Sequence, residues 1–186
     1  EAVYILAAVK AYELSAPSGE LSEGSRRLVL EDYLVPTARF LAGERKTIHN
    51  IHSWYNAAIL AIGMVAGKED LVDFALGGTG ASRHGLRDQL REGVSAEGFW
   101  REGSLGYHFY TLSSLEEQIV PARRLGRDLS RELETVKRMF LAPIAIADAR
   151  WAVPPTNDSH PGSLERYAGH YEIAAGLFPE EPALAR

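Results

Sequence analysis

The sequence predicts an all-α fold built from paired helices. Apolar residues recur three and four positions apart in one segment after another, which gives each of these segments one apolar helical face. No segment shows the alternation of apolar and polar residues that is typical of a strand. Pairs of helices are joined by short turns, and no repeat of fixed length is present. An incomplete (α/α) toroid, in which helix pairs surround a central cleft, accommodates this pattern.

The composition fits one compact domain or part of one. The 186 residues are 46% hydrophobic and 24% charged, which is enough for one core and short for two. A net charge of −5 gives no support for binding nucleic acid or an anionic membrane surface. The absence of cysteine excludes disulfides, thiol catalysis and cysteine-ligated metals. No apolar run approaches the roughly 20 residues that span a bilayer.

The chain begins directly in a segment with helical character, Glu1-Ala2-Val3-Tyr4-Ile5-Leu6. This segment has neither an initiator methionine nor the basic start of a signal peptide. We therefore expect the sequence to be part of a longer protein, whose N-terminal part carries any targeting signal.

Turn-forming residues divide the chain into its predicted helices. The first helix ends at Ser15-Ala16-Pro17-Ser18-Gly19, and the second begins after the capping residues of Ser22-Glu23-Gly24-Ser25. Pro36 predicts a kink or a break in the second helix, whose expected apolar anchors are Leu28, Tyr33 and Phe40. Gly77-Gly78-Thr79-Gly80 lacks the preceding strand and the lysine of a phosphate loop, so we expect a linker. Helices are expected at about 1–14, 26–41, 47–66, 68–76, 82–91, from 104 to an interruption at Pro121, 125–146 and 163–177.

The helix predicted at 47–66 has a polar stripe but no charged residue. No Lys, Arg, Asp or Glu occurs between Lys46 and Lys68, whereas a surface helix normally stays charged along its length. At 100° per residue its side chains form two groups, a polar one with His49, His52, Ser53 and Asn56 and an apolar one with Ile51, Tyr55, Ala58 and Ile62. We interpret this segment as an inner helix whose first turns face a polar cavity.

The segment 97–112 has a composition that a core does not require. Its sixteen positions hold five aromatic residues, one histidine, two acids, one arginine and three glycines. Helical spacing places Leu105, Phe109 and Leu112 on one face, and Tyr107, Tyr110 and Ser114 on the opposite face. Gly103 and Gly106 lie near the tyrosine face, where we expect them to leave space for a ligand to approach.

Two motifs resemble those of a known family. Trp100-Arg101-Glu102-Gly103-Ser104 followed by Tyr107-His108-x-Tyr110 resembles the W-x-E-G-S…Y-H-x-Y signature of the heparinase II/III-like polysaccharide lyases, which include oligoalginate lyases. The loop Pro154-Pro155-Thr156-Asn157-Asp158-Ser159 is similar to a P-x-x-N-D-S loop of that family. The resemblance implies that 1–186 is part of one (α/α) toroid catalytic domain and that a C-terminal β-sandwich domain lies outside it. It also implies an acidic polysaccharide or oligosaccharide as substrate, and from this substrate class we expect a periplasmic or secreted location.

Lyases of this kind cut a uronic-acid glycoside by β-elimination, which yields an unsaturated uronate. The reaction requires a neutralised carboxylate, a base for the C5 proton and an acid for the departing oxygen. By resemblance, Asn50 neutralises the carboxylate, His52 is its companion and candidate base, and Tyr107 protonates the leaving oxygen. The gap of 55 positions between His52 and Tyr107 is close to the gap expected in the family, and His49-Asn50 is the alternative pair. The other predicted substrate-binding residues are His49, Trp54, Trp100, Arg101, Glu102, His108 and Tyr110.

The geometry of the elimination decides how the proton transfers are shared. If the C5 proton and the leaving oxygen lie on the same side of the sugar, Tyr107 could make both transfers, and if they lie on opposite sides His52 is the base. Tyrosine ionises near pH 10, so a phenolate base needs a positive neighbour, for which the candidates are His52, His108 and Arg101.

Two other functions compete with the lyase. A non-catalytic glycan-binding toroid would keep Trp54, Trp100 and Arg101 without needing Tyr107. A toroidal glycoside hydrolase needs two carboxylates that flank the scissile bond, but Glu97 and Glu102 are five positions apart and diverge on a helix. We expect no cofactor and no metal, because His49 and His52 have no nearby acid to complete a metal site.

Overall fold

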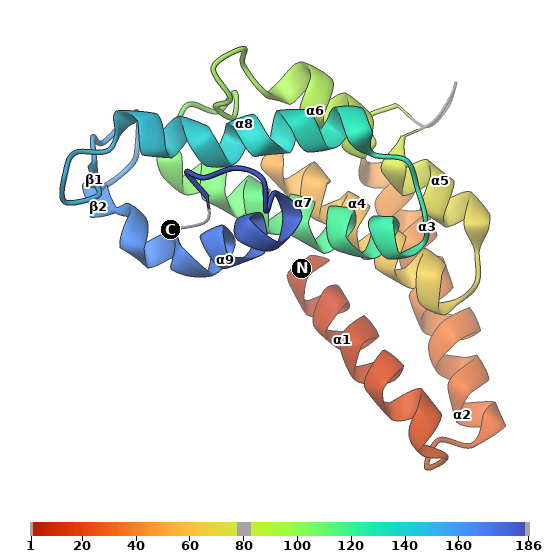
Figure 1. Ribbon diagram of the computed structural model, residues 1–186. Coiled ribbons are helices and arrows are strands. Elements are labelled where there is room, and N and C mark those ends of the chain that lie inside the picture. The colour runs from red at the N-terminus through yellow and green to blue at the C-terminus, as the bar shows by residue number, and fades with distance from the viewer. Residues whose placement is uncertain (1, 78–82, 185–186) are drawn as a thin grey trace. The chain divides into compact units, whose positions relative to one another are not determined.

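The computed structural model describes residues 2–77 and 83–184 of the chain. These residues form nine α-helices and two short strands, so the prediction of an all-α fold is confirmed (Figure 1). The chain divides into two compact units, Glu1–Asp88 and Gln89–Arg186. The predicted linker Gly77-Gly78-Thr79-Gly80 and the predicted start of a helix at Ser82 lie mostly outside the described residues.

In the first unit, the inner helix is α4 (Asn50–Val65), which packs against α1 (Ala2–Ser15), α3 (Val35–Glu44) and α5 (Glu69–Leu76) (Figure 1). The middle of α4 is fully buried, from Ala57 to Leu60. Gly63 allows the close approach of α5, since a Cβ there would lie 3.0 Å from the backbone nitrogen of Val72. The interpretation of this segment as an inner helix therefore holds. The unit also contains η1 (Ala16–Ser18), α2 (Glu23–Arg27) and η2 (Leu28–Leu34), and α6 (Leu86–Gly93) runs from this unit into the second.

The helix predicted at 26–41 is divided into several segments, and one boundary lies just before Pro36. The π-helix η2 ends at Leu34, directly before α3, and Pro36 lies in the first turn of α3. Proline and π-helical turns are two common causes of a disturbed helix. The predicted anchors were wrong, because a π-helical turn holds an extra residue and shifts the apolar positions around the axis. Leu28, Tyr33 and Phe40 are exposed, whereas the buried residues are Leu34, Val35, Ala38 and Leu41.

In the second unit, α7 (Leu105–Arg124), α8 (Ser130–Ile146) and α9 (Ala168–Leu177) pack against one another (Figure 1). The predicted apolar face of α7 is confirmed, since Leu105, Phe109 and Leu112 are all buried. The strands β1 (Ala152–Val153) and β2 (Gly162–Ser163) pair antiparallel and precede the short 3-10 helix η4 (Leu164–Tyr167).

Two predicted boundaries in this unit were wrong. Pro121 does not interrupt α7, which continues to Arg124, because a single proline removes only one hydrogen bond and the buried side chain of Ala122 keeps the last turn on the core. The helix predicted from Leu125 begins instead at Ser130. Gly126 ends the preceding turn with a φ of +72°, and the carboxylate of Asp128 accepts the Ser130 N–H at 3.0 Å.

Among the described helices, none combines the length and the apolar character that crossing a membrane requires.

Candidate functional site

The predicted catalytic residues belong to different units. His52 lies on α4 in the first unit, and Tyr107 lies on α7 in the second. The roles assigned to them by resemblance require both side chains to reach one substrate, which stays a prediction, and the geometry of each unit is described on its own.

His49 ends the coil before α4 and is not part of the helix. The helix was predicted from Thr47 but begins at Asn50, with His49 as the N-cap in an extended conformation. The Nδ1 atom of His49 accepts the N–H of Ile51 at 3.2 Å, which is the task that a Ser, Thr, Asp or Asn oxygen usually performs. Asn50 is only 4% exposed. His49 therefore has a structural reason to be present, apart from any role with substrate.

The backbone of Thr47 fixes the ring of His52. The Nδ1 atom lies 2.9 Å from the carbonyl oxygen of Thr47 and 3.2 Å from its nitrogen. The shorter contact is made when Nδ1 carries the proton and donates it to the carbonyl, and this tautomer leaves Nε2 with a lone pair. The ring is half-buried, and Nε2 makes no hydrogen bond with the described residues. In that tautomer Nε2 can take a proton from a bound molecule, whereas the tautomer in which Nδ1 accepts the Thr47 N–H carries its proton on Nε2.

One residue of the polar stripe of α4, Asn56, bonds to the buried side chain of Arg45, a contact that was not predicted from the sequence. Asn56 is fully buried, and its Oδ1 accepts a hydrogen bond from Nη1 of Arg45 at 2.6 Å. The same Arg45 nitrogen donates to the carbonyl oxygen of Phe74 at 2.8 Å, and the guanidinium lies 3.9 Å from the centre of the Phe74 ring. Burial lowers the pKa of Arg45 to about 10, and Asp88 opposes this shift, so the side chain stays charged at neutral pH. Asn56 is therefore a partner of Arg45 and not a wall of the expected polar cavity.

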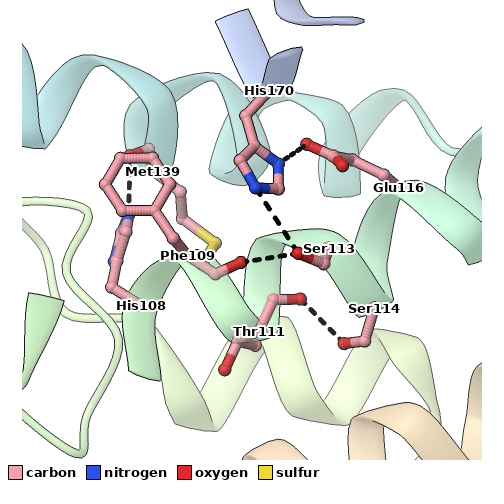
Figure 2. A network of polar contacts seen from close by, with 8 residues as sticks. All are labelled: His108, Phe109, Thr111, Ser113, Ser114, Glu116, Met139 and His170. Carbon is pink, nitrogen blue, oxygen red and sulfur yellow. Dashed lines mark hydrogen bonds and ion pairs between the residues drawn. The ribbon is translucent and has the colours of Figure 1, made fainter. Parts of the chain in front are cut away.

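In the second unit, Trp100 and His108 form one buried network with Glu102. The indole Nε1 of Trp100 donates to Oε2 of Glu102 at 2.6 Å, and the backbone N–H of Trp100 donates to Nδ1 of His108 at 3.2 Å. Nε2 of His108 donates to the carbonyl oxygen of Met139 at 2.9 Å, as Figure 2 shows. Trp100 and His108 are each 1% exposed. The expectation that these two residues contact substrate is not supported, because both ring nitrogens of His108 and the indole of Trp100 already have protein partners.

Trp54, which was also predicted to bind substrate, is 9% exposed and therefore presents little surface for a sugar to stack on.

Burial lowers the pKa of His108 to about 4. A neutral His108 cannot act as the positive neighbour that would make Tyr107 a phenolate base. Of the three residues predicted for this role, His52, His108 and Arg101, His108 is therefore wrong.

The depressed pKa of His108 predicts acid-sensitive stability. With a pKa of about 4 when folded and 6.5 when unfolded, the unfolded chain binds the proton more readily, so the stabilisation is complete above pH 6.5 and is lost as the pH falls toward 4. We expect a loss of about 2 kcal/mol in the free energy of unfolding between pH 7 and pH 5 from this residue. Urea unfolding at the two pH values measures it. His108→Gln should show a correspondingly smaller pH dependence, and equal losses in both proteins would contradict the prediction.

The hydroxyl of Tyr107 is available to a substrate. Tyr107 and Tyr110 are both 42% exposed on α7, as the spacing predicted. The Tyr107 hydroxyl makes no hydrogen bond with the described residues, and Arg101 nearby in the chain is also exposed. Ser114, expected on the same face, is fully buried and donates to the Thr111 carbonyl at 2.7 Å, because the exposed face of α7 is narrower than half of the helix.

The loop 154–159 contacts the start of α7. Oγ of Ser159 accepts the N–H of Leu105 at 2.8 Å and lies 2.9 Å from Oγ of Ser104. Nδ2 of Asn157 donates to the carbonyl oxygen of Glu102 at 3.1 Å. The Asn157 amide also fills the position that a Cβ on Gly103 would take, so the prediction of open space above Gly103 was wrong. Gly106, in contrast, is exposed, and a Cβ there would meet only Oγ of Ser104.

A Ser–His–Glu arrangement between α7 and α9 was not predicted (Figure 2). Nδ1 of His170 lies 2.7 Å from Oε1 of Glu116, and Nε2 lies 3.5 Å from Oγ of Ser113. Burial raises the pKa of Glu116, and the hydrogen bond and charge of His170 oppose that shift. Ser113 donates its hydroxyl to the Phe109 carbonyl at 3.0 Å, and its position inside a helix leaves no free N–H groups nearby to stabilise an oxyanion. We therefore interpret these residues as a structural polar contact between α7 and α9.

A separate cavity of about 420 Å³ lies between α8, η4 and α9 in the second unit. Its lining is largely apolar and includes Trp151, Leu164 and Tyr171, with the carboxylates of Glu165 and Glu172. The two carboxylates would repel an anionic glycan, so this cavity does not suit the expected substrate. No group of three or more His, Asp or Glu residues that could hold a metal ion is found within 2–77 and 83–184.

A family model described as alginate lyase matches residues 8–140, which is well over half of the chain and includes the segments of His52 and Tyr107. A search of curated proteins finds no match.

Proposed function

Because the chain belongs to the alginate lyase family of polysaccharide lyases, we propose that it cleaves a uronic-acid-containing glycan by β-elimination and leaves an unsaturated uronate. The observation that carries the proposal is the state of Tyr107. This tyrosine lies in the Y-H-x-Y motif, is 42% exposed and has a hydroxyl that no described residue engages.

We propose further that the enzyme is of the heparinase II/III-like type and that 1–186 is part of its (α/α) toroid, with a β-sandwich domain elsewhere in the protein. Two motifs support this assignment, the W-x-E-G-S segment with the following Y-H-x-Y and the P-x-x-N-D-S loop. Asn157 and Ser159 of the loop contact Glu102 and Leu105, which gives a physical reason for both motifs to occur together. A periplasmic or secreted location follows from the substrate class and is part of the proposal.

The proposed reaction assigns one task to each of three residues. Asn50 neutralises the uronate carboxylate, so that negative charge can develop at C5, and because Asn50 is only 4% exposed this role requires its amide to become accessible when substrate binds. Nε2 of His52 takes the C5 proton while the bond from C4 to the glycosidic oxygen breaks and a C4–C5 double bond forms. The hydroxyl of Tyr107 donates its proton to the departing oxygen. If both transfers occur on one face of the sugar, Tyr107 performs the first as well as the second.

The non-catalytic alternative depends on surface aromatic residues that could stack on sugars. Trp54 and Trp100 were its main supports, and both are buried. Arg101 remains exposed, but one exposed arginine is a common surface feature and does not favour a glycan-binding module over an enzyme.

A panel of uronate polymers tests the proposal in the whole protein. We expect ultraviolet absorbance from the unsaturated uronate to rise with at least one of alginate, heparan-type glycans and hyaluronan, because elimination creates a double bond conjugated to the carboxylate. A neutral glucan is the matched control and should give no absorbance. Binding to a uronate polymer without any rise in absorbance would instead favour the glycan-binding alternative.

A further inference from the structure

We propose that the loop 154–159, called here the capping loop, positions Tyr107 by providing the N-terminal cap of α7. This inference rests on the proposed function, since it concerns the residue that donates the proton. It assigns Ser159 and Asn157 as positioning residues, which act through the helix and have no contact with the substrate.

The first turn of α7 does not cap itself. Ser104 occupies the N-cap position with an extended backbone, but its side chain makes no cap hydrogen bond to its own helix. Its hydroxyl is 2.9 Å from that of Ser159, and Ser159 accepts the free N–H of Leu105 at 2.8 Å. The first N–H groups of a helix have no partner within the helix. Here a residue 54 positions along the chain supplies one.

Asn157 holds the other side of the same turn. Its amide donates to the Glu102 carbonyl at 3.1 Å and lies against Gly103. Both backbones at this contact are left-handed, with φ of +48° at Asn157 and +73° at Gly103, a conformation that asparagine and glycine adopt more readily than other residues. Any side chain at Gly103 would displace the amide. The contact therefore requires this residue pair.

The capping loop is itself held at both ends. Ala152 pairs with Ser163 and Val153 with Gly162 in the β1–β2 ladder that closes the loop. Inside it, the N–H of Ser159 donates to the Thr156 carbonyl at 2.9 Å. The loop can thus fix the start of α7, because its own ends and its turn are bonded.

Tyr107 is two residues beyond Leu105, so a movement of the first turn moves the Tyr107 hydroxyl with it. A displacement of about 1 Å at a reacting group is enough to lower a rate by about 100-fold. The cap should therefore affect the rate of proton donation more than the binding of substrate.

Ser159→Ala in the whole enzyme tests this inference. We expect kcat to fall about 10-fold to 100-fold while KM changes by less than about 3-fold, and we expect Ser159→Thr, which keeps the hydroxyl, to recover most of the activity. Ser22→Ala is the matched control. Ser22 caps α2 in the first unit through the N–H of Ser25 at 3.1 Å, so this variant loses an equivalent cap and should keep its kcat. Equal losses in Ser159→Ala and Ser22→Ala would overturn the inference.

Amide hydrogen exchange separates this inference from the proposed function. In Ser159→Ala we expect exchange at 105–108 to become about 10-fold faster, while exchange in the middle of α7 stays unchanged. Unchanged exchange at 105–108 would overturn the cap whatever the activity. Full activity of Tyr107→Phe would overturn the catalytic part, and faster exchange at 105–108 would then still support the cap.

Discussion

Tyr107→Phe is expected to lower turnover of the whole enzyme by about 100-fold to 10,000-fold, because it removes the proton donor to the leaving oxygen. The loss corresponds to roughly 3 to 5 kcal/mol of activation free energy, and it should be larger if Tyr107 is also the base. The ring is kept, and the lost hydroxyl bonds to no described residue. The free energy of unfolding should therefore change by no more than about 1 kcal/mol. Steady-state kinetics on the uronate polymer and urea unfolding measure the two effects.

Tyr110→Phe is the matched control for this substitution. Tyr110 has the same exposed fraction, 42%, and lies one turn further along the same face of α7. We expect this variant to keep most of its activity. An inactive Tyr110→Phe beside an active Tyr107→Phe would shift the assignment by one turn, and two active variants would favour the glycan-binding alternative.

Helical spacing predicted the buried side of a helix correctly where the helix is regular and packs with one face against the core. The face of α7 with Leu105, Phe109 and Leu112 is an example, and so is the uncharged helix α4. The same method failed across η2, where a π-helical segment changes the period on which the prediction rests. It also overestimated the open face of α7, since Ser114 turned out to be buried.

The predicted roles failed where side chains find partners far along the chain. His108 has a polar ring in a motif, which favours a site, yet its ring is satisfied by Trp100 and by Met139 on another helix. Arg45 was not singled out, because a lone arginine before a helix gives no sign that Asn56 and Phe74 will enclose it. The available signal in the sequence was Asn56 in an uncharged helix. Such a helix is expected to be buried, and a buried amide requires a hydrogen-bond partner.

The capping loop shows what a motif can and cannot predict. The sequence pattern singled out the loop together with the W-x-E-G-S segment, but periodicity does not say that Ser159 bonds to the N–H of Leu105. Asp158, which lies between the two contacting residues, is exposed. The side chains that matter structurally are therefore those of its neighbours, Asn157 and Ser159.

His52→Gln is the second variant with a large expected effect. If the C5 proton and the leaving oxygen lie on opposite sides of the sugar, loss of the base should lower kcat by about 100-fold to 10,000-fold. Glutamine can still donate a hydrogen bond to the Thr47 carbonyl, where Nδ1 of His52 now lies at 2.9 Å, so the fold at the start of α4 should be preserved. Kinetics on the polymer that gives the strongest absorbance measure the effect.

His49→Ala decides between the two candidate histidines, and its comparison with His52→Gln assigns the stereochemistry. His49 caps α4, so we expect His49→Ala to lower the free energy of unfolding by about 1 kcal/mol and to leave most of the turnover intact. A large loss of turnover in His49→Ala with a healthy His52→Gln would move the catalytic pair to His49 and Asn50. If both histidine variants stay active while Tyr107→Phe is inactive, Tyr107 makes both proton transfers on one face of the sugar. Arg101, which is exposed, would then be the candidate for the positive neighbour of the phenolate in the second unit, because His108 with a pKa of about 4 is uncharged at neutral pH.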